Sequence, residues 1–280
     1  MSALRTAVSW LFVPASRPER FAKAVGSGAQ AVVIDLEDAV SPDGDGKARA
    51  RAALRDAWPG AAGVPVVVRV NGARTPEHTA DLAACRALAP AAVVLPKAES
   101  AEQVRAAAEA SGVPVLPLIE SARGLVRLAE ITAGPSCVRL LFGGVDLALD
   151  LGVSDDAALD ASRADLVRWS AAAGLPAPVD GVSTALRDTA AVTREAARAK
   201  GWGFGGKLCV HPAQIPPVHA AFAPGEDEVR WARRVLAVGQ DGAAVADGEM
   251  IDRPVVERAR RIVREAERVG QTERAARAGR

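Results

Sequence analysis

The sequence contains no tyrosine and only three cysteines in 280 residues. Cys85, Cys137 and Cys209 are too few and too scattered for a disulfide framework or a cysteine zinc site, so we expect a reducing, cytoplasmic setting. No apolar run reaches the roughly 20 residues of a membrane span, and the first residues lack the layout of a secretion signal. The 35 basic and 34 acidic residues nearly cancel. The sequence therefore predicts neither a nucleic-acid partner nor a membrane partner.

Short apolar runs alternate along the chain with helical patterns. Runs such as 31–34 and 66–68 show no polar alternation, which is typical of strands buried on both faces of a parallel sheet. We expect strands over residues 10–14, 31–36, 64–70, 91–95, 113–119, 138–142, 178–182 and 203–210, and helices over 18–25, 47–57, 78–88, 101–110, 124–131, 161–173 and 186–200. About eight such units predict an α/β fold of the (β/α)8 TIM-barrel type. A doubly wound sheet is the alternative, although no Gly-x-Gly-x-x-Gly follows the first strand.

The chain after residue 224 departs from this alternation. We expect a helix over 226–238, a small irregular or β segment over 242–250, and a long amphipathic helix over 254–269. A barrel over residues 1–224 is complete without this part. The sequence therefore predicts that residues 225–280 form a C-terminal helical extension that caps a site or packs on a neighbouring subunit.

Polar side chains follow most of the predicted strands. A barrel places its active site where the C-terminal ends of its strands meet, so we expect these side chains to converge. They are Asp35, Glu37, Asp38, Arg69, Asn71, Lys97, Glu99, Glu120, Asp146, Asp180, Lys207 and His211.

Glu120 and Asp146 follow neighbouring predicted strands and are our candidate metal ligands. Carboxylate oxygens suit Mg²⁺, which keeps several positions for water and substrate. The alternative is that both acids form ion pairs with nearby cations, namely Lys97, Arg123 or Arg139.

Gly143 and Gly144 lie shortly before Asp146, separated from it by Val145. Glycine lets backbone amides approach an anion closely, so we expect these two residues to bind a substrate carboxylate, together with Lys97 at another strand end. The alternative is a tight turn from strand to helix.

Arg69 ends an all-apolar strand, and its guanidinium offers a bidentate fork for a substrate carboxylate. The alternative is a structural ion pair with Glu37 or Asp38. We expect Asp35, Glu37 and Asp38 to hold water molecules around the metal, with Glu37 as a candidate base.

The histidines do not form a catalytic constellation with serine, cysteine or aspartate along the chain. We expect His211, which precedes Pro212, to serve a turn, and Cys209 to be a buried strand residue.

Taken together, these motifs resemble the citrate lyase β-subunit-like family of the HpcH/HpaI aldolase superfamily, over roughly residues 8–260. The resemblance implies a (β/α)8 barrel, Mg²⁺ on Glu120 and Asp146, Arg69 holding an α-keto-acid carboxylate, and a homotrimer or a multiple of it. The motifs that carry it are Leu11-Phe12-Val13-Pro14, Arg17-Pro18-Glu19-Arg20-Phe21, Asp35-Leu36-Glu37-Asp38-Ala39-Val40, Val68-Arg69-Val70-Asn71, Leu95-Pro96-Lys97, Leu118-Ile119-Glu120-Ser121, Gly143-Gly144-Val145-Asp146-Leu147 and Gly206-Lys207-Leu208-Cys209-Val210-His211-Pro212.

The segment from Asp247 to Pro254 is similar to the C-terminal motif of the malyl-CoA and citramalyl-CoA lyase branch. That resemblance implies that Asp252 reaches a neighbouring subunit's site as an acid or base. The alternative is a helix N-cap, because Asp252 lies two residues before a proline.

Many members of this family have Arg-Ser before the first strand and glycine after Val-Pro. This chain has Val8-Ser9 and Ala15 at these positions. This departure puts the family's nucleotide contacts in doubt. Arg17, Arg20 and Lys23 are the candidates for them.

The resulting prediction is a Mg²⁺-dependent carbon–carbon lyase that cleaves a β-hydroxyacyl-CoA to acetyl-CoA and an α-keto acid, or catalyses the reverse Claisen condensation. The alternatives are a citrate lyase β-subunit-like enzyme that acts on a citryl thioester of an acyl-carrier protein and gives oxaloacetate, a class II pyruvate aldolase, and a non-enzymatic carrier-docking or regulatory barrel.

Overall fold

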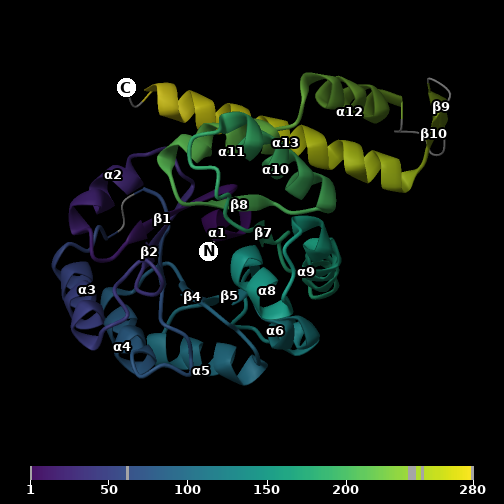
Figure 1. Cartoon of the computed structure of the whole chain (residues 1–280). Coiled ribbons are helices and arrows are strands. Elements are labelled where there is room, and N and C mark those ends of the chain that lie inside the picture. Colours follow the sequence, from purple (N-terminus) through teal and green to yellow (C-terminus); the bar gives the residue numbers. More distant parts are fainter. Residues whose placement is uncertain (1, 61–62, 239–243, 247–248, 279–280) are drawn as a thin grey trace. The chain divides into compact units, whose positions relative to one another are not determined.

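The computed structural model describes residues 2–60, 63–238, 244–246 and 249–278. Eight parallel strands close into a barrel in chain order (Figure 1). They are β1 (Ser9–Pro14), β2 (Ala31–Asp35), β3 (Val66–Arg69), β4 (Val93–Leu95), β5 (Val115–Ile119), β6 (Leu141–Phe142), β7 (Val179–Asp180) and β8 (Gly206–Cys209). Because β1 also pairs with β8, the sheet is closed. The predicted (β/α)8 barrel is confirmed and the doubly wound sheet was the wrong alternative.

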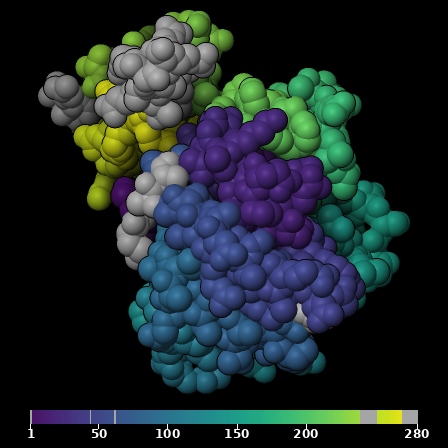
Figure 2. Space-filling view, turned by 90° about the vertical axis from the view of Figure 1, so that its left-hand side faces the viewer, coloured from purple at the N-terminus to yellow at the C-terminus, as the bar shows by residue number. Residues whose placement is uncertain are grey.

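Helices surround the barrel strands in Figure 1, and Figure 2 shows the outer surface formed by the earlier segments, purple to blue. The helices are α1 (Ser2–Thr6), α2 (Phe21–Val25), α3 (Gly44–Asp56), α4 (His78–Leu88), α5 (Ala101–Ser111), α6 (Ala122–Val126), α7 (Leu128–Ala133), α8 (Gly144–Leu151), α9 (Asp160–Ala172), α10 (Thr189–Trp202) and α11 (Ile215–Phe222), with 3-10 turns η1 (Pro18–Arg20), η2 (Asp156–Leu159) and η3 (Pro212–Gln214).

The helices of the barrel differ from the sequence prediction in several places, and α1 was not expected. The helix expected over 124–131 is divided into α6 and α7, which meet at Arg127. Helix α8 was not predicted, because it begins at Gly144 and glycine is a poor helix former. Helix α8 starts directly after β6, so it carries Asp146 in its first turn at the mouth of the barrel.

The core has two apolar layers that the strands separate. Val33 lies in the cluster inside the barrel, whereas its neighbours Val32 and Ile34 belong to the cluster between strands and helices. Successive side chains of a strand point to opposite faces, and here both faces are buried. This arrangement explains why the strands are continuous apolar runs.

Local signals set the ends of the helices. Ser100 is the N-cap of α5, and its side chain accepts a hydrogen bond from the backbone of Gln103; Gly112 follows the last residue of the helix in the left-handed conformation. A serine N-cap and a glycine after the last turn satisfy backbone groups that a helix leaves unpaired. Such ends keep the loops short and hold the strand ends in place.

Residues Ala223–Arg280 form a second compact unit, separate from Met1–Phe222. It contains α12 (Glu226–Val238), an antiparallel pair of strands, β9 (Ala244–Ala246) and β10 (Glu249–Ile251), and α13 (Arg253–Ala278). Ala232 and Val235 of α12 share an apolar cluster with Ala259 and Ile262 of α13, as the amphipathic pattern predicts. Helix α13 extends nine residues past the predicted end at 269. That this unit caps a site or joins subunits stays a prediction.

None of the described helices combines the length and the apolar composition needed to cross a bilayer.

The two-layered core leads to a stability prediction. Leu116 is fully buried inside the barrel, whereas Leu149 on α8 is 82% exposed. Leu116→Ala leaves a cavity and should lower the free energy of unfolding by about 2–5 kcal/mol. The same change at Leu149 should cost less than about 0.5 kcal/mol. Urea denaturation followed by circular dichroism measures both, and equal losses would contradict this assignment of the core.

Candidate active site at the mouth of the barrel

A cavity of about 400 Å³ opens at the C-terminal ends of the strands, and we call it the mouth cavity. Every lining residue belongs to a strand end or to the segment that follows. The lining consists of Phe12, Pro14, Asp35, Asp38, Ala39, Arg69, Leu118, Glu120, Phe142, Gly143, Gly144, Val145, Asp146, Val182, Leu208 and Val210. Both candidate metal ligands and Arg69 therefore share one cavity, as the barrel prediction requires.

Glu120 lies directly after β5 and is 3% exposed. Its Oε1 accepts a hydrogen bond of 2.8 Å from the backbone amide of Lys97. A Cβ atom on Gly143 would lie only 2.5 Å from Glu120 Oε2, so the carboxylate occupies space that any other residue at position 143 would fill. The amide of Gly143 donates to Ile119 O at 2.9 Å. The Gly143 amide is therefore already paired, whereas Gly144 begins α8. Binding of a substrate carboxylate by these two glycines stays a prediction.

Lys97 lies near three acids of the site, Glu37, Glu120 and Asp146. Its Nζ is 3.9 Å from Glu37 Oε1 and 4.0 Å from Asp146 Oδ1. Its backbone is left-handed, with φ of 47°, a conformation that costs a non-glycine residue about 1 kcal/mol or more. The strained backbone directs an amide at Glu120, while the ammonium group faces two other carboxylates. Of the predicted ion-pair partners of Asp146, Lys97 is therefore the one found.

Arg69 ends β3, and its guanidinium is held by three acids. Its Nε and Nη2 atoms donate to the two carboxylate oxygens of Asp35, both at 2.7 Å. Its Nη1 lies 3.0 Å from Glu37 and 3.3 Å from Asp38, and the group lies over the Phe12 ring at 5.0 Å. The ion-pair alternative is thus confirmed. The sequence analysis missed Asp35 as the partner that takes the fork, although strand register places Asp35 beside Arg69.

Two glutamates of the site have raised pKa values. Burial, opposed by Arg69, raises the pKa of Glu37 to about 7. Burial, reinforced by the charges of Glu37 and Asp146, raises the pKa of Glu120 to about 8. The charged form of a buried carboxylate is disfavoured unless positive charge compensates it, so this cavity favours a bound cation.

The two carboxylates of Glu120 and Asp146 suit a magnesium ion, which takes most of its remaining ligands from water and substrate. They are too few for a metal that needs a full set of protein ligands. Mg²⁺ commonly binds through one or two carboxylates and keeps several waters, which matches Glu120 and Asp146. Glu37 Oε2 is buried and, despite its ion pair, makes no hydrogen bond with the described residues. Among those same residues there is no cluster of three or more acidic, histidine or cysteine ligands.

The predicted alternative partners Arg123 and Arg139 do not meet the two acids. Arg139 donates to Leu4 O and Ala7 O at the other end of the barrel. Arg123 lies 3.9 Å from Glu99.

Several polar residues expected at this mouth lie elsewhere. Asp180 and Lys207 pair with each other at 2.7 Å and line a second cavity. Val179 and Leu208 point into the barrel, so their neighbours Asp180 and Lys207 point outward. The expected convergence was wrong for these two residues.

Three further residues serve structural roles. Asn71 bonds to Asp81 and to Leu36 O, and Glu99 accepts from Ser121. His211 caps η3 by accepting from the amide of Ala213, which confirms its predicted turn role. Cys209 is buried in β8 as expected.

Asp252 lies between β10 and α13, and its side chain accepts a hydrogen bond of 3.2 Å from the amide of Val255. This is the N-cap alternative, and a role in a neighbouring site stays a prediction. Asp247 and Gly248 of the same motif lie outside the described residues.

The candidate nucleotide contacts follow β1. Arg17 pairs with Glu19 at 2.6 Å, and Arg17 and Arg20 are both half exposed. Lys23 lies on α2.

Fold and site together define a (β/α)8 barrel whose mouth carries a metal-compatible pair of carboxylates and a buried arginine. The chain matches the HpcH/HpaI aldolase/citrate lyase family over residues 8–212 and belongs to it. It is 39% identical over 271 residues to a citrate lyase subunit beta-like protein of Mycobacterium tuberculosis, covering 92% of this chain and 94% of the relative. It is 33% identical over 273 residues to a (3S)-malyl-CoA thioesterase of Cereibacter sphaeroides, covering 93% and 95%.

A solved structure shares this architecture. The protein CitE from Mycobacterium tuberculosis, in complex with magnesium, acetoacetate and coenzyme A, matches with a TM-score of 0.82 and 38% identity, over 94% of this chain and 99% of that one. The family resemblance expected from the motifs is confirmed.

The raised pKa values predict how stability depends on pH. The folded protein keeps protons on Glu37 and Glu120 to about pH 7 and 8, whereas an ordinary glutamate has a pKa of 4.5. Unfolding therefore releases protons in this range, so the stability these groups give is complete below about pH 4.5 and is lost as the pH rises to about 8. In EDTA, Glu120→Gln should gain melting temperature relative to wild type from about pH 5 to 8.

Glu130 lies on α7 with about half of its side chain exposed and provides the control. The melting temperature of Glu130→Gln should differ from that of wild type by the same amount at every pH from about 5 to 8. An equally constant difference for Glu120→Gln would contradict the raised pKa.

The contact between Glu120 and Gly143 leads to another prediction. Gly143→Ala forces the new methyl group into Glu120 and should lower the free energy of unfolding by about 1–3 kcal/mol. A Cβ atom on Gly134 would meet nothing within 4 Å, so Gly134→Ala is the matched control and should be nearly neutral. Chemical denaturation compares the two, and indistinguishable variants would show that the contact is not tight.

Proposed function

We propose that the protein is a Mg²⁺-dependent carbon–carbon lyase that cleaves a β-hydroxyacyl-CoA of the malyl- or citramalyl-CoA type to acetyl-CoA and an α-keto acid, or catalyses the reverse condensation. One observation carries this proposal: Glu120, Asp146 and Arg69 line a single cavity at the mouth of the barrel. A cavity of about 400 Å³ accommodates the acyl part of such a substrate.

In this proposal the cavity binds the keto-acid half of the substrate. Glu120 and Asp146 hold Mg²⁺, which when bound supplies a Lewis acid for the carboxylate and hydroxyl oxygens. The Nη1 atom of Arg69, which Glu37 and Asp38 contact in this structure, binds the same carboxylate, and Asp35 keeps the guanidinium in one orientation. The Gly144 amide at the start of α8 and the Lys97 ammonium group add positive potential.

Two protons move during cleavage. Glu37 takes the proton of the β-hydroxyl group, the bond between the α and β carbons breaks, and its electron pair passes to the thioester as an enolate. The hydroxyl carbon becomes the keto group. Asp252 of a neighbouring copy then protonates the enolate carbon, which gives acetyl-CoA. The pKa of Glu37, about 7, suits a base at neutral pH.

The proposed reaction also involves neighbouring subunits and the CoA nucleotide. A shared Asp252 requires a homo-oligomer, a trimer or a multiple of it, and Arg17, Arg20 and Lys23 are the proposed contacts of the CoA nucleotide. The protein acts in the cytoplasm on small molecules.

Thioester hydrolysis is a second candidate, favoured by the 33% identity to a (3S)-malyl-CoA thioesterase. Citryl thioester cleavage is a third, favoured by the 39% identity to a citrate lyase subunit beta-like protein. A class II aldolase would more naturally use a histidine base, and the lining of the mouth cavity includes no histidine.

Product analysis separates these reactions. Malyl-CoA and citramalyl-CoA with Mg²⁺ should yield a keto acid, which is measured as its phenylhydrazone. Free CoA should not appear, because a lyase keeps CoA as its thioester; a dye that reacts with thiols detects any that does. Thiol without keto acid would identify a thioesterase. Absence of both from these two substrates, with keto acid from a citryl thioester, would identify the citrate-lyase type.

Arg69→Lys should lower the rate of keto-acid release by about 100-fold or more, because lysine lacks the planar fork and misplaces the substrate. Arg123→Lys changes an exposed arginine of α6 and should retain wild-type kinetics. Near-normal rates for a folded Arg69→Lys would contradict its substrate role.

Mixed oligomers test the role of Asp252. Asp252→Asn can still cap α13 but cannot transfer a proton, and should lower kcat by about 10²–10⁴. Asp188 is a comparable N-cap on α10, so Asp188→Asn controls for a capping effect and should keep its activity. Mixing Asp252→Asn with inactive Glu120→Ala subunits should restore part of the activity. No recovery after verified subunit exchange would place Asp252 in its own chain's site.

A further inference from the structure

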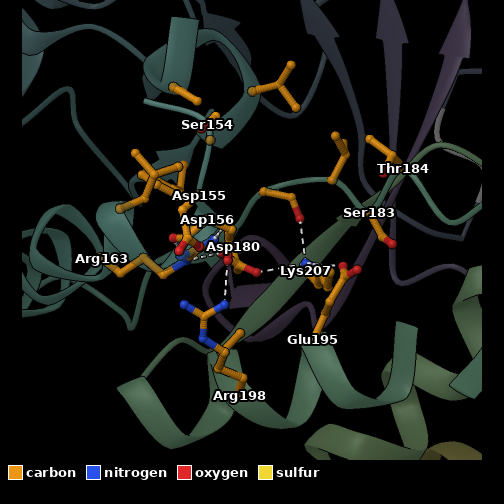
Figure 3. A pocket seen from close by; sticks show the side chains of 18 residues that line it. Ser154, Asp155, Asp156, Arg163, Asp180, Ser183, Thr184, Glu195, Arg198 and Lys207 are labelled. Atoms are coloured by element: carbon orange, nitrogen blue, oxygen red, sulfur yellow. Dashed lines mark hydrogen bonds and ion pairs between the residues drawn. The ribbon is translucent and has the colours of Figure 1, made fainter. Parts of the chain in front are cut away.

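A second cavity, of about 410 Å³, lies on the other side of the turn that joins β6 to α8. We call it the rear cavity. It shares Phe142, Gly144, Val145 and Val182 with the mouth cavity, so these residues separate the two. Figure 3 shows its charged side chains pointing toward one another, with Asp180 and Lys207 from the strands and Arg163, Glu195 and Arg198 from the helices around them.

The cations of the rear cavity are already paired with acids of its own wall. Lys207 Nζ donates to Asp180 Oδ2 at 2.7 Å and to Gly181 O at 2.9 Å, and lies 3.6 Å from Glu195. Arg163 binds Asp156 and Asp160 as well as Asp180.

Arg198 also pairs with Asp156 and Asp160. Because these donors bind wall acids, the network favours a structural role over anion binding.

Gly181 connects this network to the turn that carries Asp146. A Cβ atom on Gly181 would lie 3.0 Å from Phe142 O and 3.3 Å from the amide nitrogen of Gly144. The backbone after β7 therefore packs against the backbone that enters α8. Arg163 adds a second contact, since its guanidinium lies over the Phe142 ring at 5.1 Å.

We propose that Lys207, acting through Gly181, is a positioning residue that fixes the β6–α8 turn and thereby the metal ligand Asp146. This inference rests on the proposed function for the role of Asp146 as a ligand. Lys207 is 3% exposed, so its ammonium group is held by Asp180 and Gly181 O rather than by water. Removal of that group frees the Gly181 carbonyl and leaves Asp180 with Arg163 at 3.4 Å as its cationic partner.

Two variants change the network without touching either proposed ligand. Lys207→Met removes the ammonium group, and Gly181→Ala pushes a methyl group against Phe142 O. Because the second keeps every charge, it decides the question if the first fails to fold. Arg139→Met is the control, since Arg139 is a buried cation, 1% exposed, that bonds to Ala7 O at the opposite end of the barrel.

Hydrogen exchange and calorimetry test the inference together. In EDTA, both variants should exchange the amides of residues 143–147 faster than wild type, and calorimetric titration should show about tenfold weaker Mg²⁺ binding. Arg139→Met should lose melting temperature while keeping wild-type exchange in this segment and wild-type Mg²⁺ affinity. Wild-type exchange and affinity in a folded Lys207→Met or Gly181→Ala variant would overturn the inference.

The wild-type titration separates this failure from that of the proposed function. A wild-type protein that binds no Mg²⁺ would overturn the metal site and the role of Lys207 toward it. The exchange data would then still decide whether the network fixes the turn.

Discussion

The contact between a buried carboxylate and a glycine governs the mouth of this barrel. Parallel pairing of β5 with β6 places the ends of these two strands side by side, so Glu120 meets the backbone of residue 143. The carboxylate leaves no room for a side chain there, and the glycine in turn begins the turn into α8. Helix α8 then presents Asp146 from its first turn. Two acids thus reach one cavity because of a steric requirement between neighbouring strands.

Two networks of charged side chains lie on either side of that turn. In and around the mouth cavity Arg69 is held by Asp35, Glu37 and Asp38, while burial leaves Glu37 and Glu120 with raised pKa values. In the rear cavity Lys207, Arg163 and Arg198 are paired with acids of the wall. The mouth cavity therefore retains acidic groups that favour a cation, and the rear network has charge pairs that stabilise its own wall.

Much of this arrangement follows from sequence patterns, because barrel strands are continuous apolar runs and a barrel brings their ends together. The strands and the ion pairs of Arg69 with Glu37 and Asp38 were predictable in this way, whereas Asp35 as the main partner of Arg69 was missed. The outward direction of the Lys207 side chain was not predictable, because the sequence Gly206-Lys207-Leu208 does not indicate which residue faces the interior of the barrel. Helix α8 was hidden by Gly143 and Gly144 at its start, and Glu120 requires the first of these two glycines. The proposed proton-transfer role of Asp252 depends on a second chain, and no pattern within one sequence determines that arrangement.

The central claim is that Glu120 and Asp146 bind one divalent cation at the mouth of the barrel. The most direct measurement is anomalous X-ray scattering from crystals of the protein soaked in Mn²⁺, a common substitute for Mg²⁺ in oxygen-ligand sites. The account predicts a single strong peak in each subunit, within about 2–2.5 Å of a carboxylate oxygen of both residues. A peak bound elsewhere, for instance among the acids of the rear cavity, or no peak between these two carboxylates, would contradict it.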